Sequence, residues 1–258
     1  MFESNSKSTL HSKNVVGPAA ALAYGFVLLV ILEVLLWRSN PILVGHLRTA
    51  SLIYALISLW IWTQYPKHAP GLPFGLANYI TLGRAALVSI FAGFIGFPET
   101  VTESSLLIVF IGILALILDG IDGWIARRTG TAGPFGARFD MELDGFFILI
   151  LCLLVIEAGR IGWWVLWAGL LRYIYVVAGL FIARLRQPLE PRKWRQAIAV
   201  IQTTALLACL PPLLGKSIET AVLLITVGLL TWSFVTDMIW QLKRDPDRAL
   251  SEENDLSL

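Results

Sequence analysis

Long apolar runs separated by short polar segments fill almost the whole chain. Several of these runs approach the roughly 20 residues that a helix needs to cross a bilayer. We predict eight membrane-spanning helices, at about residues 18–37, 49–64, 78–97, 105–126, 140–158, 162–182, 197–213 and 219–241. The pattern therefore predicts an all-α integral membrane protein, in which helices pack against one another within lipid.

The polar segments divide the chain into four parts. Residues 65–77 hold three prolines and two glycines, a composition typical of a linker or a segment lying at the membrane surface. We predict an N-terminal membrane extension with two transmembrane helices (1–64), this linker (65–77), a main domain (78–241) and a polar cytoplasmic tail (242–258). Glu33 lies near the end of the first span, where we expect it to be solvated at the interface.

Composition agrees with a membrane protein. The chain is 57% hydrophobic with a mean hydropathy of +0.73, above the roughly half-apolar composition of soluble domains. Cys152 and Cys209 both fall inside apolar runs and are expected to be small packing residues rather than a disulfide. The net charge of +2 identifies no partner, and no nucleic-acid partner is expected.

Basic residues are distributed unequally between the two sides of the predicted bundle. Over the last six spans, one side carries eleven Lys and Arg residues, and the opposite loops carry only Arg160 and Lys216. The positive-inside rule then places the first side, and both chain termini, in the cytoplasm. Arg38 and Arg48 fall on the other side, which weakens the prediction for the first two spans.

Four aspartates interrupt the apolar pattern between residues 119 and 144. We call Asp119, Asp122, Asp140 and Asp144 the acid cluster. The first two are three residues apart and the last two are four apart, so each pair shares a helix face. A glycine-rich connector, 127–139, lets the two helices fold back on each other. Four close carboxylates repel unless cations compensate them. All-oxygen ligands favour Mg²⁺ or Mn²⁺, and we expect one or two ions.

Capping, proton relay, ion transport and catalysis are alternative roles for these acids. Asp140 alone is equally consistent with a helix N-cap. Arginines around the cluster favour catalysis, because guanidinium groups bind phosphate in a bidentate manner. Glycines at 123 and 136 allow close approach to the backbone. Metal ligands, cations for phosphate and open backbone together indicate diphosphate chemistry.

The same stretch carries the pattern D-x2-D-G-x2-A-R-x8-G-x3-D-x3-D with every spacing intact. Its members are Asp119, Asp122, Gly123, Ala126, Arg127, Gly136, Asp140 and Asp144. This pattern resembles the signature of the CDP-alcohol phosphotransferase family, membrane enzymes of phospholipid synthesis. The resemblance covers about residues 70–245 and implies a six-helix catalytic core, to which the first two spans are an addition.

The resemblance implies a reaction and a set of roles. CDP-diacylglycerol, or a similar CDP-linked lipid, would be attacked by an alcohol hydroxyl, releasing CMP. Asp119, Asp122 and Asp140 would bind two metal ions, and Asp144 would bind metal and act as general base. Gly123, Ala126, Arg127 and Gly136 would border the nucleotide. The family also implies a bacterial inner-membrane location, a cytoplasmic active site and a possible homodimer.

Two arginines inside predicted spans are further candidates. Asn78, Thr81 and Arg84 recur three residues apart and resemble the N-x-x-T-x-x-R run of the family's first domain helix. That resemblance favours a substrate-facing Arg84. Arg172 lies within the sixth span, and we predict that it serves the acceptor alcohol or its phosphate.

The sequence leaves open which alcohol is the acceptor, and it allows alternatives to an enzyme. Glycerol-phosphate enzymes of this family follow the third acid with P-x-A-D-K, whereas this chain reads Met-Glu-Leu-Asp-Gly at 141–145. That departure weakens the glycerol-phosphate hypothesis without naming another acceptor. An ion-coupled carrier would use the acid cluster as a cation site, but neither inverted repeats nor broken helices are evident. A catalytically silent membrane protein would have lost some of the acids.

Overall fold

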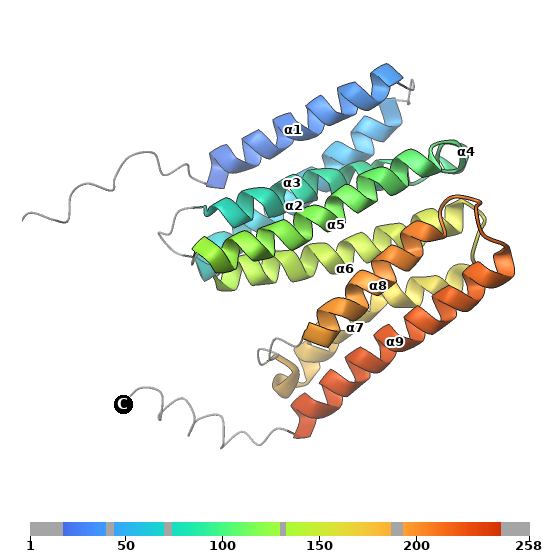
Figure 1. Ribbon diagram of the computed structural model, residues 1–258. Helices are drawn as coiled ribbons and strands as arrows, with labels where there is room; N and C mark the ends of the chain where they lie inside the picture. Colours follow the sequence, from blue (N-terminus) through green and yellow to red (C-terminus); the bar gives the residue numbers. More distant parts are fainter. Residues whose placement is uncertain (1–17, 40–43, 70–73, 130–132, 187–192, 244–258) are drawn as a thin grey trace, which may run out of the picture. The chain divides into compact units, whose positions relative to one another are not determined.

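The computed structural model describes residues 18–39, 44–69, 74–129, 133–186 and 193–243, and these residues are almost entirely helical (Figure 1). No strand occurs in these ranges. The helices are α1 (Pro18–Ser39), α2 (Val44–His68), α3 (Leu76–Gly93), α4 (Pro98–Glu103), α5 (Ser105–Thr129), α6 (Pro134–Glu157), η1 (Trp163–Val165), α7 (Leu166–Phe181), η2 (Ala183–Arg186), α8 (Lys193–Ala208) and α9 (Lys216–Lys243). The predicted all-α membrane fold is confirmed.

Each of the eight predicted spans corresponds to a helix, and six of those helices are long and apolar enough to cross a membrane. The other two are α6 and α8. Helix α8 has only 16 residues. The first half of α6 carries charged side chains from Arg138 to Asp144, which lower its apolarity. Those charges include two members of the acid cluster.

Helix boundaries differ from the predicted spans at several places. The predicted connector 127–139 is mostly helical, because α5 continues to Thr129 and α6 begins at Pro134, so Asp140 lies inside α6 and is not its N-cap. Helix α3 ends at Gly93 rather than near residue 97, because Gly96 has a φ of 89° and Pro98 begins a new short helix, α4. Helix α2 continues to His68, with Pro66 inside it, and so extends into the segment predicted as a linker. The N-terminal residues 1–17 and most of the predicted tail lie outside the described residues.

The chain divides into two units, and the first comprises residues up to Ile95 together with Phe110–Leu143. Helix α3 lies at its centre, in contact with both α1 and α2 (Figure 1). In its most apolar 18-residue stretch, 72% of the residues are buried, compared with 22% in α1 and α2. Small residues such as Ala85, Ala86 and Ser89 give α3 a slim surface against which neighbouring helices pack closely.

The two helices of the N-terminal extension are held to each other and to α3 by side chains that fill glycine sites. The Tyr54 hydroxyl of α2 donates a hydrogen bond to the Leu22 carbonyl of α1 (3.0 Å) and fills the space beside Gly25. His46 lies against Gly93 of α3, where an added Cβ would come within 2.6 Å of the imidazole ring. The extension is therefore an integral part of this unit.

Glu33 is buried, so its predicted solvation at the interface is wrong. It retains 7% exposure, and its Oε2 lies 3.0 Å from Nδ1 of His46, which is 1% exposed. The pairing joins α1 to the start of α2. Burial of a carboxylate is tolerated where a hydrogen-bonding partner is buried with it.

The second unit comprises Gly96–Val109 and the chain from Asp144 onward. Helix α9 contacts both α7 and α8, while Gly169 lets α7 approach the backbone of α6 at Leu149. Arg160 forms an ion pair with Glu219, which has no exposed surface, and also donates a hydrogen bond to the Leu214 carbonyl (2.9 Å). This Arg160–Glu219 pair joins the turn after α6 to the beginning of α9.

Candidate metal centre

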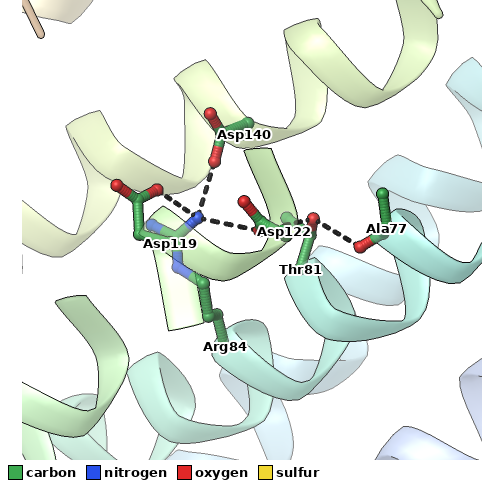
Figure 2. A network of polar contacts seen from close by, with 6 residues as sticks. All are labelled: Ala77, Thr81, Arg84, Asp119, Asp122 and Asp140. Carbon is green, nitrogen blue, oxygen red and sulfur yellow. Dashed lines mark hydrogen bonds and ion pairs between the residues drawn. The ribbon is translucent and has the colours of Figure 1, made fainter. Parts of the chain in front are cut away.

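Three members of the acid cluster converge on one arginine in the first unit (Figure 2). The apolar run of α5 continues as a helix to Thr129, so Asp119 and Asp122 project from the same face near its end. Nη1 of Arg84, on α3, lies 2.6 Å from Oδ1 of Asp119 and 3.4 Å from Oδ2 of Asp122. The same nitrogen is 2.6 Å from Oδ1 of Asp140, on α6. Three helices therefore meet at this site.

Thr81 joins the same network from one turn earlier on α3. Its hydroxyl lies 2.9 Å from Oδ2 of Asp122 and 3.0 Å from the Ala77 carbonyl, so its single proton is shared between two acceptors. Thr81 and Asp122 are each 4% exposed. Helix α3 thus supplies two donors to the most buried acid, and these donors fix the orientation of its carboxylate.

The remaining acid, Asp144, lies one turn after Asp140 on the continuous helix α6. One carboxylate oxygen from each of Asp119, Asp140 and Asp144 lies within 4.8 Å of the other two. A single guanidinium cannot neutralise so many carboxylates, and the surplus negative charge must attract further cations. Hard oxygen ligands at this spacing suit a divalent ion such as Mg²⁺ or Mn²⁺.

Both glycines of the motif stand at close approaches. A Cβ on Gly123 would lie 3.2 Å from Nη1 of Arg127, so this guanidinium folds back over the glycine one turn earlier. A Cβ on Gly136 would lie 2.9 Å from Oδ1 of Asn78, on α3. Ala126 is half-buried and Arg127 is exposed. The glycines therefore make room for an arginine and an amide, both able to bind a polar ligand.

Arg172 belongs to the second unit and lies against the backbone of α6. Its Cγ would be 2.8 Å from a Cβ at Gly145, the residue that follows Asp144. Tyr175, one turn further along α7, is close enough to Arg172, Arg195 and Asp237 to interact with them electrostatically. Arg195 also forms an ion pair with Asp237 (3.3 Å). Two arginines are therefore within electrostatic range of one tyrosine in this unit.

Sequence reasoning missed three contacts of the first unit. Thr81 and Arg84 are three residues apart and so lie on the same face of α3. That spacing could have predicted that Thr81 also reaches the acid cluster, where it contacts Asp122. The other two contacts join the N-terminal extension to α6. Trp60 stacks on Phe139, with ring centroids 6.0 Å apart, and Nε2 of His68 lies 3.1 Å from Nη1 of Arg138. These contacts pair residues about 70 positions or more apart, for which the sequence carries no local signal.

The chain resembles known proteins over most of this region. The family model for CDP-alcohol phosphatidyltransferase matches residues 74–232. A CDP-diacylglycerol–glycerol-3-phosphate 3-phosphatidyltransferase of Pectobacterium atrosepticum is 28% identical over 171 residues, which cover 62% of this chain and 91% of that relative. The enzyme of the same name from Escherichia coli K12 is 28% identical over 148 residues, covering 55% of this chain and 78% of the relative.

No solved structure matches the chain. The family match extends from just before α3 into α9 and includes all four members of the acid cluster, while α1 and α2 lie outside it. The match covers more than half of the chain and agrees with the sequence pattern. The chain therefore belongs to the CDP-alcohol phosphatidyltransferase family.

Proposed function

We propose that the chain transfers the phosphatidyl group of CDP-diacylglycerol to the hydroxyl of a small alcohol that carries its own phosphate, and releases CMP. The observation that carries this proposal is the convergence of Asp119, Asp122 and Asp140 from two helices that bear an intact family motif. The relatives that match this chain are named for the same donor and for glycerol 3-phosphate.

The acid cluster fits a divalent-metal site by its donor atoms. Asp119, Asp122, Asp140 and Asp144 would hold the metal, in our proposal two ions of Mg²⁺ or Mn²⁺. The bound metal would polarise the diphosphate oxygens and stabilise the charge on the departing CMP. Arg127, beside Gly123, offers a guanidinium to the diphosphate, and the open backbone at Gly123 and Ala126 leaves space for the nucleotide.

Asp144 would remove the proton from the acceptor alcohol. The alcohol oxygen then forms a bond to the phosphorus that bears diacylglycerol, and the bond from that phosphorus to the CMP oxygen breaks. A carboxylate beside cations stays ionised at neutral pH, as a general base must. Asp144 is half-buried and one turn from Asp140, and so is held on the helix that also positions a metal ligand.

A phosphate on the acceptor would explain the arginines of the second unit. Arg172 and Arg195 are within electrostatic range of Tyr175, and guanidinium groups can bind a phosphate monoester. Residues 141–145 depart from the P-x-A-D-K pattern of glycerol-phosphate enzymes, so the acceptor subsite differs in detail. Glycerol 3-phosphate is the first acceptor to test.

The acceptor test uses purified full-length protein, CDP-diacylglycerol and Mg²⁺ or Mn²⁺. CMP release is measured with glycerol 3-phosphate, inositol phosphate, serine, inositol and choline, each alone. We expect release with a phosphate-bearing alcohol, its loss in chelator and its loss in Asp144→Asn. Glu142→Gln, an acid of the same helix turn that is outside the motif, is the matched control and should remain active.

Two other outcomes would be informative. Release with an uncharged acceptor alone would retain the transferase and overturn the phosphate-bearing acceptor. If no CMP is released with any alcohol, and the protein shows no metal-dependent binding of CDP-diacylglycerol, the results would contradict the enzyme hypothesis and favour the ion-coupled carrier.

The chain is an integral membrane protein, and we place it in the bacterial inner membrane with the acid cluster and both termini on the cytoplasmic side. The basic residues at the ends of α5 and α9 support this orientation. An impermeant thiol reagent applied to intact cells should label the Leu213→Cys variant, since Leu213 is 74% exposed, and should leave the Arg128→Cys variant unlabelled. The reverse pattern would invert the topology. Native Cys152 and Cys209 are buried.

A further inference from the structure

One nitrogen of Arg84 lies close to three members of the acid cluster. Nη1 is 2.6 Å from both Asp119 and Asp140 and 3.4 Å from Asp122 (Figure 2). Three carboxylates from two helices are arranged around one positively charged point, which is the arrangement that a bound cation produces.

The hydrogen-bonding capacity of that nitrogen is smaller than the demand on it. Nη1 carries two N–H groups, so it serves at most two of the three carboxylates well, and the longest distance falls on Asp122. Asp122 accepts a further bond from Thr81. One positive charge therefore stands among three acids, and the site keeps a net negative charge that a divalent ion would satisfy better.

A metal ion and the Arg84 guanidinium would compete for the same carboxylate oxygens. Mg²⁺ binds oxygen at about 2.0–2.1 Å. An ion bound to the same oxygens of Asp119 or Asp140 would therefore lie within about 5 Å of Nη1, where two cations repel strongly. Arg84 is 2% exposed, so solvent does little to weaken that repulsion.

We propose that Arg84 is the resident cation of the metal-free acid cluster, and that a divalent ion must displace it from Asp119 and Asp140. Arg84 thereby holds the carboxylates together before metal arrives and lowers the affinity of the site for metal. The inference rests on the metal site of the proposed function. A displaced guanidinium inside an anion-handling site would then be available to the substrate diphosphate, in keeping with the substrate-facing role predicted for Arg84.

The test measures metal binding without any lipid substrate. Full-length wild type, Arg84→Gln, Arg84→Lys and Arg138→Gln are placed in nanodiscs, and bound Mn²⁺ is measured by electron paramagnetic resonance during titration. Arg84→Gln should bind Mn²⁺ about 5–100-fold more tightly than wild type, the usual range for coupling between two sites. Arg84→Lys keeps the charge and should remain near wild type. Arg138→Gln, which contacts His68 rather than the acids, should not change the affinity.

Thermal unfolding supplies a second readout. In chelator, Arg84→Gln should unfold at a lower temperature than wild type, because its acids have lost their cation. Saturating Mn²⁺ should then raise its Tm by more than it raises that of wild type, because tighter binding stabilises the folded state more. A variant that folds in Mn²⁺ and unfolds when the metal is removed would support the same conclusion.

Three results would overturn the inference about Arg84. Provided that wild type binds Mn²⁺, they are equal or weaker Mn²⁺ binding by Arg84→Gln, an equal or smaller metal-induced rise in Tm, and a variant that stays unfolded even in saturating Mn²⁺. Failure of the proposed function would look different, since neither wild type nor Arg84→Gln would then bind Mn²⁺.

Discussion

Arg84 with its three acids in the first unit, and the Arg160–Glu219 pair in the second, both bring an arginine and carboxylates together in a membrane protein, but the two groups differ in charge balance. Arg160 meets one acid and also donates to the Leu214 carbonyl, although its Nε and Oε2 of Glu219 have no hydrogen-bond partner among the described residues. Nη1 of Arg84 lies within 3.4 Å of three acids. A pair of one acid and one base is balanced in charge and acts as a structural link, whereas an acid cluster with surplus negative charge can bind a further cation.

The Glu33–His46 pair of the N-terminal extension resembles the Arg160–Glu219 pair in this respect. It joins one carboxylate to one imidazole, and its second oxygen and Nε2 have no hydrogen-bond partner in the described structure. The imidazole also packs edge-on against Phe94, with ring centroids 4.4 Å apart. These contacts are mainly with the extension and with α3, so we assign the pair to packing rather than to chemistry.

The largest expected effect comes from removing one acid of the cluster. Asp140→Asn should lower the rate of CMP release by about 10²–10³-fold, the range for loss of one electrostatic group at a reaction centre. Its Tm in chelator should be unchanged or higher, because one repelling charge is gone. Activity and thermal unfolding are measured on the same preparation. If Asp140→Asn loses activity only because it unfolds, then Asp140 has a structural role, as we assign to the Arg160–Glu219 pair, and the prediction is contradicted.

Breaking the Arg160–Glu219 pair should reduce stability and leave activity largely unchanged. Glu219→Gln leaves Arg160 without its anion and should lower the free energy of unfolding by about 3–5 kcal/mol, as for buried pairs that lose one partner. The rate per folded molecule should stay near wild type below the Tm. The double variant Arg160→Met/Glu219→Leu should recover much of the stability, since apolar pairs often replace buried ion pairs without cost. A loss of rate per folded molecule would give this pair a catalytic role.

A moderate effect is expected where the extension meets α3. Gly93→Val would place side-chain atoms against the His46 ring and should cost about 1–3 kcal/mol of stability through overpacking. His46→Ala in the same chain should restore part of that loss, because it empties the crowded space. Denaturant or thermal unfolding of the single and double variants gives the coupling energy. Additive effects would show that the two residues do not share this space.

The smallest expected effect is a difference in stability loss between substitutions of two neighbouring tryptophans. Trp60 is half-buried and stacks on Phe139, whereas Trp62 is 54% exposed. Trp60→Ala should lower the free energy of unfolding by about 1–2 kcal/mol, below the usual range for a fully buried aromatic residue. Trp62→Ala is the control and should change it by less than about 0.5 kcal/mol. Equal losses would indicate that both act only as interfacial anchors.

The apolar runs were enough to predict the helices, because each helix in lipid must satisfy its own backbone hydrogen bonds. The turn at Gly96 was not predicted, since an apolar pattern does not reveal a positive φ. The spacing of the acids gave their helix faces. It did not give Arg84 as their common partner, since that contact joins α3 to helices 35 or more residues away.

Glu33 is a second case in which a contact between two helices could not be predicted from the sequence. Its distance from the end of the span suggested solvation, but the deciding residue was His46, thirteen positions later on the next helix. A homodimer, implied by the family resemblance alone, stays a prediction, and so do the assigned roles of the site residues.

One titration tests the central claim that the acid cluster is a catalytic metal centre. CMP release from CDP-diacylglycerol and glycerol 3-phosphate is followed while free Mn²⁺ rises from chelated to saturating, and bound Mn²⁺ is measured on the same samples. We predict that the rate of wild type rises in proportion to occupancy and is absent in chelator. Asp140→Asn should show little CMP release and little bound Mn²⁺. Full CMP release in chelator, or full Mn²⁺ occupancy and activity in Asp140→Asn, would contradict the claim.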